Sequence, residues 1–387
     1  MIRNSNFRLI IFFALSLVLL VNTYSQTISF HSKDTIGDRP RNTIGIGGII
    51  KLVTTYDYLG LPNGSSFNMY EIPTTNDKKN PSLMFNAWQS RIKIKNNFIT
   101  KKKEEVIGYI EGDFSGATPG GFRLRYAYVK FKNWTIGQTD SGMSNLDVWV
   151  NISDFDGPPV GTWVRQPLIK YTLNLDTNNQ FNFSIEDPVL DYAQIDVLDP
   201  DLIPTKPVIP DVVFNYRHKF KTGNFQFSSV ARVLAYQKND VRERTLGYGA
   251  TFSGTFNLLK KDLFIYQGLI GKGIERYLVG LGGYNLDAVP FNNKLEALPV
   301  YGGYFGYQHY WNSNLNSSFL YGYQKVENNL YKDFSNPFEG NYYSANLFFD
   351  PIENVNFGFE FVYGDRKDIN DNSGRNHRAY FTVEYSF

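Results

Sequence analysis

Polar and apolar residues alternate with a period of two along most of the chain, and the pattern is clearest at the C-terminal end. One set of alternate positions is apolar or aromatic, and the set between them is largely polar; the first set is His377, Ala379, Phe381, Val383, Tyr385 and Phe387, and the second is Arg378, Tyr380, Thr382, Glu384 and Ser386. A period of two is typical of a β-strand whose two faces meet different surroundings. The polar face is too polar to form the core of a soluble β-sandwich. It fits a barrel that has lipid on the outside and water on the inside. The alternative is an ordinary antiparallel edge strand.

The same pattern recurs in sixteen segments and predicts an all-β fold, a transmembrane antiparallel up-and-down β-barrel of about 16 strands. The expected strands are 44–58, 84–98, 105–115, 122–131, 133–139, 165–175, 180–189, 210–220, 223–236, 245–257, 262–271, 298–311, 314–326, 340–350, 354–364 and 376–387. Short turns alternate with longer loops, as in bacterial outer-membrane barrels, whose short turns are periplasmic. The segment 278–284 could form another strand, and we interpret it as part of a loop.

The N-terminal residues predict export. Arg3 and Arg8 precede an apolar run from Leu9 to Val21, and small residues follow up to Ser25. This is the pattern of a cleaved secretory signal peptide, since the alternative, a retained membrane anchor, needs about 20 apolar residues.

The expected organisation follows from this signal and from the strand pattern. Residues 1–25 form the signal peptide, residues 26–43 a short periplasmic segment and residues 44–387 the barrel, in the outer membrane of a Gram-negative bacterium. The terminal Phe387 resembles the sorting signal that the β-barrel assembly machinery of that membrane reads.

The composition restricts the possible chemistry. The sequence has 27 Tyr and 32 Phe, no Cys and four His, so disulfides and thiolate chemistry are excluded. The formal net charge of +2 falls to zero when Arg3 and Arg8 leave with the signal peptide, so nothing indicates binding to nucleic acid. His218 and His309 fall on the aromatic face near turns, where we expect interface residues rather than ligands. We therefore expect no cofactor, no metal site and no catalytic residues, and we expect membrane lipid and small hydrophilic solutes as partners.

Parity within the strands turns one set of charged side chains toward the lumen. The inward set has eleven basic residues and six acidic ones; they are Lys51, Arg91, Lys93, Lys95, Arg123, Arg125, Lys170, Arg217, Lys219, Arg232 and Arg378, with Asp57, Glu111, Asp113, Glu186, Glu360 and Glu384. Ion pairing among solvated lumen residues is one interpretation, and we prefer it for Lys95, Lys219 and Glu384. Arg91, Arg123, Arg125 and Lys170 instead suggest a basic ladder for anionic solutes, because arginine holds carboxylates through paired hydrogen bonds.

The third long loop, 140–164, carries the acidic residues Asp140, Asp147, Asp154 and Asp156. A loop of this length in a compact architecture is usually functional. If it folds inward, it forms a constriction and sets negative charge against the basic wall, which ranks solutes by charge. The alternative is an outer, solvent-exposed loop.

Five short motifs resemble the DcaP-like family of trimeric outer-membrane porins; they are Tyr109–Phe114, Arg123–Tyr128, Gly137–Thr139, Asp154–Pro158 and Arg165–Thr172. The resemblance implies a homotrimer of sixteen-stranded barrels that passes small anionic solutes, dicarboxylates among them. It also implies pore-lining roles for Arg123 and Arg125 and constriction-loop roles for Asp154 and Asp156. Lys170 stands where the family more usually has arginine.

These observations predict a porin for passive diffusion. One alternative is a non-conducting structural or adhesion barrel, whose lumen should be plugged or apolar. The other is an outer-membrane hydrolase, which needs a nucleophile beside a positioned base. We find no such pair in the sequence.

Overall fold

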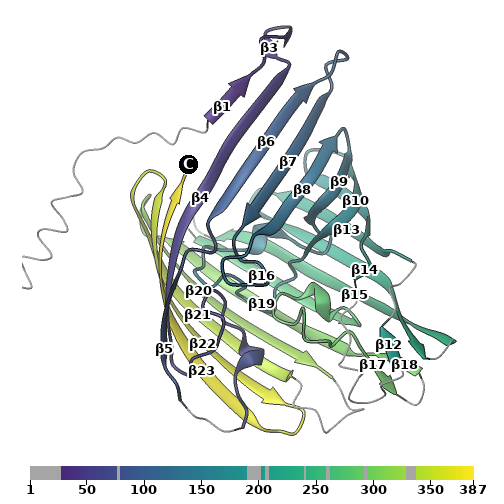
Figure 1. Ribbon diagram of the computed structural model, residues 1–387, viewed down its shortest axis with the longest axis vertical. Coiled ribbons are helices and arrows are strands. Elements are labelled where there is room, and N and C mark those ends of the chain that lie inside the picture. Colours follow the sequence, from purple (N-terminus) through teal and green to yellow (C-terminus); the bar gives the residue numbers. More distant parts are fainter. Residues whose placement is uncertain are drawn as a thin grey trace, which may run out of the picture.

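The computed structural model describes residues 28–75, 79–189, 202–204, 209–238, 241–258, 262–291, 294–327 and 337–387. In this part of the chain, sixteen antiparallel strands pair in sequence order, and the last pairs with the first to close a barrel (Figure 1). The signal peptide expected over 1–25 lies outside the described residues. None of the helices among the described residues is long and apolar enough to cross a membrane.

The strands agree closely with those expected from the alternating pattern. The barrel strands are β4 (Asn42–Asp57), β6 (Arg91–Ile99), β7 (Glu105–Asp113), β8 (Arg123–Phe131), β9 (Trp134–Asp140), β10 (Arg165–Asn174), β11 (Asn179–Glu186), β13 (Asp211–Phe220), β14 (Gly223–Lys238), β15 (Val241–Leu258), β16 (Asp262–Lys272), β19 (Pro299–Tyr310), β20 (Leu315–Val326), β21 (Pro337–Ile352), β22 (Val355–Asp368) and β23 (Ser373–Ser386). The predicted barrel is confirmed, and the segment 278–284 lies in a loop as expected.

The described chain also contains shorter elements, which lie beside the barrel strands or in the loops. They are strands β1 (Ile28–His31), β5 (Ser82–Asn86) and β12 (Leu202–Pro204), the hairpins β2 (Thr35–Ile36) with β3 (Arg39–Pro40) and β17 (Ala288–Phe291) with β18 (Lys294–Ala297), and the 3-10 helices η1 (Met69–Glu71), η2 (Leu146–Val148) and η4 (Glu275–Tyr277). Within the expected periplasmic segment 26–43, β1 pairs with residues Thr43–Ile46 of β4.

One expected strand, 84–98, is interrupted. The chain forms β5, turns at Ala87–Ser90, and resumes as β6. The turn is held by local polar groups, because the Asn86 side chain accepts a hydrogen bond from the Trp88 N–H and the Ser90 hydroxyl accepts one from the Lys51 N–H. The prediction of one continuous strand over 84–98 was therefore wrong. Polar groups that form a turn compete here with the backbone hydrogen bonds of the sheet.

The two faces of the wall follow the predicted parity. On β15, the Phe252 side chain is 49% exposed, whereas its neighbours Thr251 and Ser253 are 2% and 1% exposed. In a barrel the exposed aromatic set faces outward and the small polar set faces the interior. His218 and His309 contact aromatic residues of the outward set, Phe225 and Trp311 respectively, as expected.

The seam between β23 and β4 joins the two ends of the chain. The N–H of Phe387 donates to the Gly48 carbonyl at 3.0 Å, and the Gly48 N–H donates to the Phe387 carbonyl at 2.9 Å. A Cβ atom at Gly48 would lie 2.7 Å from Cζ of Phe387, so glycine makes room for the terminal ring. In Figure 1 the C-terminus accordingly lies beside β4, at the end that carries β1.

A buried ion pair reinforces the seam from inside the barrel. Arg378 Nε lies 2.7 Å from Asp57 Oδ2, and both side chains are fully buried. The same guanidinium donates to the carbonyls of Asn63 and Ser66, which belong to the loop after β4. Arg378 therefore connects both seam strands to that loop.

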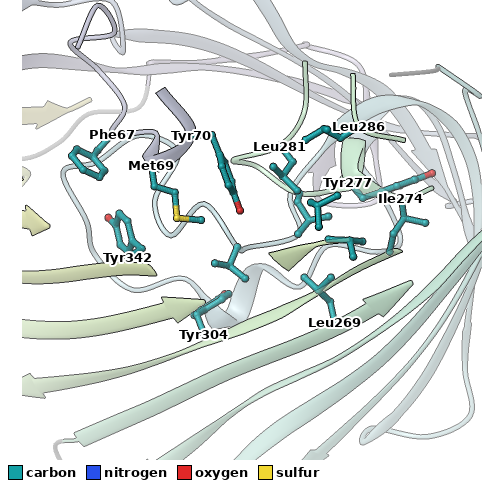
Figure 2. Packing of buried hydrophobic residues seen from close by; sticks show 14 of the residues in the cluster. Phe67, Met69, Tyr70, Leu269, Ile274, Tyr277, Leu281, Leu286, Tyr304 and Tyr342 are labelled. Atoms are coloured by element: carbon teal, nitrogen blue, oxygen red, sulfur yellow. The ribbon is translucent and has the colours of Figure 1, made fainter. Parts of the chain in front are cut away.

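Three long loops of the described chain pack together inside the barrel, at the end away from the C-terminus. Figure 2 shows Phe67 and Tyr70 from the loop 58–81 on one side and Tyr277 and Leu281 from the loop 273–298 on the other. Val148 and Val160 of the third loop, 141–164, belong to the same cluster. The interior is thus filled at this end by an apolar cluster of loop residues, which contacts wall residues such as Tyr304.

The seam ion pair gives a stability prediction. We expect Arg378→Ala to lower the free energy of unfolding by about 3 to 5 kcal/mol, because it leaves the Asp57 carboxylate buried without its counter-charge. Denaturant unfolding of detergent-solubilised protein measures this. Lys132→Ala is the control, since the Lys132–Glu104 ion pair is exposed. An equally small effect of both substitutions would contradict the role assigned to Arg378.

Candidate functional site

The loop 141–164 crosses the interior of the barrel. Its backbone and side chains are hydrogen-bonded to one wall strand after another: Asn145 Nδ2 donates to Ser253 Oγ at 3.0 Å, Tyr304 Oη donates to the Val148 carbonyl at 3.0 Å, and Asn346 Nδ2 donates to the Asn151 carbonyl at 2.9 Å. These partners lie on β15, β19 and β21. The loop therefore folds inward as expected, and the alternative of a solvent-exposed outer loop is wrong.

Asp154 fastens the far end of this loop. Its carboxylate accepts hydrogen bonds from the Phe67 N–H at 2.7 Å, from the Tyr342 hydroxyl at 2.9 Å and from the Tyr380 hydroxyl at 3.2 Å. The N–H groups of Ser153 and Asp154 in turn donate to Glu360. One carboxylate thus joins the inward loop, the loop 58–81 and the wall.

Burial shifts the titration of the loop carboxylates. Desolvation, aided by the nearby Glu360, raises the pKa of Asp154 to about 7, against the hydrogen bonds that favour its charged form. Burial also raises the pKa of Asp156, whose carboxylate accepts a hydrogen bond from the Ser66 hydroxyl at 2.5 Å. Both groups hold loops together and neither presents a free carboxylate to the lumen.

The other two predicted loop acids are also engaged. Asp140 accepts hydrogen bonds from the Tyr126 hydroxyl at 3.1 Å and from Trp163 Nε1 at 2.8 Å. Asp147 forms an ion pair with Arg217 of β13. Each of the four loop acids predicted to face a basic wall therefore has a hydrogen-bond or ion-pair partner in the protein.

Arg123 and Arg125 form an ionic block with the neighbouring strand β7. Arg123 binds both carboxylate oxygens of Asp113, at 2.9 and 2.6 Å, and Arg125 contacts Glu111 at 2.7 Å and Asp113 at 2.8 Å. Both guanidinium groups lie over the ring of Phe155 in the inward loop. Arg125 is 1% exposed, so its charge is used within the protein.

Arg91 and Lys170 are placed differently. Arg91 lines a cavity of about 420 Å³ between the inward loop and the wall; Lys51, Gln89, Trp149, Phe155, Trp163 and Glu384 also line it. Lys51 lies 3.6 Å from Glu384, whereas no hydrogen bond or ion pair holds the Arg91 guanidinium among the described residues. Lys170 Nζ lies 3.5 Å from the Asp140 carbonyl.

Sequence reasoning missed Arg165. Its guanidinium lies 4.8 Å from the ring centroid of Trp163 and 5.7 Å from that of Tyr126, and among the described residues it forms no ion pair. Arg165 is the first residue of β10, where the chain leaves the inward loop. Its position directly after the loop was the available signal.

A β-bulge explains a second group of missed residues. Between Glu111 and Gly112 the pairing of β7 with β8 shifts by one residue, so that Arg125 and Tyr126 both face inward. The bulge also turns Tyr128 inward, where its ring lies 5.4 Å from that of Tyr109. A row of aromatic rings thus lines the lumen. The Tyr109 ring contacts the Tyr126 ring, and the Arg165 guanidinium lies between the rings of Tyr126 and Trp163.

Comparison with known proteins places this geometry among outer-membrane channels. The family model described as DcaP outer membrane protein matches residues 23–387. The outer membrane channel DcaP of Acinetobacter baumannii has 21% identity and a TM-score of 0.79, over 92% of this chain and 99% of that one. An anion-selective porin from Comamonas acidovorans has 8% identity and a TM-score of 0.61, over 89% of this chain and 100% of that one. OmpT of Vibrio cholerae has 8% identity and a TM-score of 0.56, over 92% of this chain and 100% of that one. A search of curated proteins gave no match.

The Asp154 contacts predict a pH dependence. In the folded protein the Asp154 carboxyl keeps its proton up to about pH 7, whereas in the unfolded chain it loses the proton near its ordinary pKa of 3.8. The folded state then binds more protons between these values, so its stability falls as the pH rises through this range. We expect thermal unfolding of the native protein to shift to lower temperature from about pH 4 to about pH 7, and Asp154→Asn to reduce this slope.

The matched control for this measurement is Asp176→Asn, because Asp176 lies in an exposed turn after β10 and its pKa is lowered by hydrogen bonds from Asn178 and Asn179. Its substitution should leave the slope above about pH 5 unchanged. If Asp154→Asn showed the same slope as the native protein, the carboxyl would not be the titrating group.

Proposed function

The chain belongs to the DcaP outer membrane protein family. We propose that its pore carries small hydrophilic anions, dicarboxylates among them, by passive diffusion across the outer membrane. The observation that carries the proposal is a charge imbalance in the lumen. Arg91 and Arg165 form no ion pair with a carboxylate among the described residues. The loop acids are held in place by the protein, Asp147 by an ion pair with Arg217 and Asp140, Asp154 and Asp156 by hydrogen bonds from neutral groups. Unpaired positive charge therefore lies beside the cavity under the inward loop.

The chemistry of the cavity suits anionic solutes. Arginine stays charged at all relevant pH values and offers parallel N–H donors that match a carboxylate. Arg91 and Lys51 line the cavity on the wall side, and Arg165 lies over Trp163, which also lines it. A solute with two carboxylates can therefore use more than one of these cations, which supports dicarboxylates as substrates.

The sequence-based roles for Arg123 and Arg125 are changed by this picture. We propose that these residues fix the shape of the constriction, because they are held by Glu111 and Asp113 and support Phe155 of the inward loop. Arg123 keeps 32% of its side chain exposed, so it also adds positive charge to the lumen surface. Asp140, Asp147, Asp154 and Asp156 position the constriction loop.

We propose that the native assembly is a homotrimer, as the family resemblance implies. A structure of OmpT from Vibrio cholerae in a trimer form shares the barrel, with 10% identity and a TM-score of 0.55. The outward wall of this chain is rich in exposed aromatic and aliphatic residues such as Ile110 and Phe252, which can meet either lipid or a neighbouring subunit.

We also propose that the β-barrel assembly machinery recognises Phe387. Its ring belongs to the outward aromatic set and stacks near that of Tyr385, with centroids 6.3 Å apart. In the closed barrel the Phe387 backbone groups are paired with Gly48, so a partner can pair with this backbone only before the seam forms.

Ion selectivity tests the proposed pore. In planar bilayers with a salt gradient, we expect the native channel to prefer anions and Arg91→Gln with Arg165→Gln to reduce this preference. Liposome-swelling rates should fall roughly tenfold for succinate but little for a neutral sugar of similar size, because about 1.4 kcal/mol of charge-assisted binding is lost. Lys219→Gln, an exposed lysine on β13, is the control. Cation preference in the native channel would overturn the proposal.

Oligomer mass tests the assembly. We expect native mass spectrometry of the detergent-solubilised mature protein to give three copies per particle, and heating in detergent to release single chains. A single copy under mild detergent conditions would contradict the homotrimer and leave the pore proposal unaffected.

A further inference from the structure

A second cavity lies on the outside of the barrel, between the loop 58–81 and strands β22 and β23. It has a volume of about 690 Å³ and is lined by Tyr58, Lys79, Tyr363, Asp365, Arg375 and His377 among others. We call this group of six residues the rim pocket. None of the features of the pore described above involves it.

The rim pocket lies where the outward face meets the cell exterior. β23 begins at Ser373 and ends beside Phe387, so Arg375 and His377 are at the long-loop end of the barrel. In outer-membrane barrels the long loops are extracellular and the short turns periplasmic. Below the pocket on the same face follow Phe361 and Phe359, which are 52% and 56% exposed. The pocket therefore lies above the apolar band, at the depth of the outer-leaflet headgroups.

Aromatic rings hold one cation and one imidazole in place. Lys79 Nζ lies 4.9 Å from the centroid of the Tyr58 ring, and Tyr58 stacks on His377 with centroids 4.3 Å apart and an interplanar angle of 21°. Tyrosine is enriched at the membrane interface because its ring is apolar and its hydroxyl is polar. This stack fixes Lys79 at the edge of the membrane.

Arg375 supplies a second cation, which forms no ion pair among the described residues. It faces Asp365 across the β22–β23 pairing, yet the Asp365 carboxylate accepts hydrogen bonds from the Asn341 N–H at 3.2 Å and from Asn341 Nδ2 at 2.9 Å. Among the described residues, neither Arg375 nor Lys79 forms an ion pair within 4.0 Å. Both side chains are exposed.

We propose that the rim pocket binds the phosphate group of an outer-leaflet lipid headgroup. Arginine and lysine are the side chains that bind phosphate oxygens, the first through its planar set of donors and the second as a point charge. A lipid, rather than free phosphate, is favoured because the apolar strip of Phe359 and Phe361 continues below the cations, where acyl chains would pack. The tyrosine rings then flank the headgroup.

Lipid binding to the purified full-length protein tests this inference. Titration of detergent-solubilised, delipidated protein with diphosphorylated lipid A, followed by native mass spectrometry, gives the dissociation constant. We expect Lys79→Ala with Arg375→Ala to raise the dissociation constant about thirtyfold, since each surface cation contributes about fivefold to the binding of an anionic lipid. Dephosphorylated lipid A should bind the native protein as weakly as phosphorylated lipid A binds the variant.

Lys367→Ala provides the matched control, because Lys367 lies on the same rim but is already paired with Asp371 at 2.7 Å. It should leave the dissociation constant unchanged. Inorganic phosphate, added at the same concentration as the lipid A, should not displace the lipid A from the protein. The inference is overturned if the control weakens binding as much as the double variant, if dephosphorylated lipid A binds equally well, or if inorganic phosphate competes equally.

Pore conductance and oligomer mass separate this inference from the proposed function. The substituted side chains face away from the lumen, so single-channel conductance of the double variant should equal that of the native protein. Dissociation of the native assembly by the double variant would instead identify the rim pocket as a subunit contact and overturn the lipid assignment.

Discussion

Closure of the strand ring is the constraint on which the rest of this structure depends. In lipid, every backbone N–H and C=O group must be satisfied within the protein, so the sheet can have no open edge in the membrane. The pairing of β23 with β4 meets this requirement. Closure in turn gives each strand a lipid-facing side and a lumen-facing side. Charged side chains then lie on the lumen side, because their transfer into lipid costs free energy.

The interior is consequently crowded with charges that neutralise one another. Arg125 with Glu111 and Asp113, Arg232 with Asp211 and Asp287, and Arg378 with Asp57 are buried groups of this kind. Among the described residues of the interior, Arg91 and Arg165 differ from these groups, because neither forms an ion pair with a carboxylate. Function in this pore is therefore best sought among the unpaired charges, because the paired ones mainly hold strands and loops in position.

Much of this fold could be predicted from the sequence, because polar and apolar residues alternate along the strands. A sheet that has to close on itself then leaves few alternatives for the strand order. The interruption at Ala87–Ser90 and the bulge at Arg125 could not be predicted, since each depends on a local shift in hydrogen bonding that leaves the alternation of residue types intact. The inward course of the loop 141–164 was correctly predicted, but its partners were not. The contacts of Asp154 with Phe67, Tyr342 and Tyr380 join residues far apart in the sequence.

The seam has a consequence for how the protein is made. Arg378 and Asp57, which meet across it, are separated by 321 positions along the chain. Contacts between residues so distant in sequence form slowly, because a large loop must close before they contribute. Until β23 has been exported, β4 has an unpaired edge, and edges of this kind promote aggregation. The seam can therefore form only once the whole chain has been exported, and until then the edge of β4 that β23 covers has to be kept from pairing with other chains.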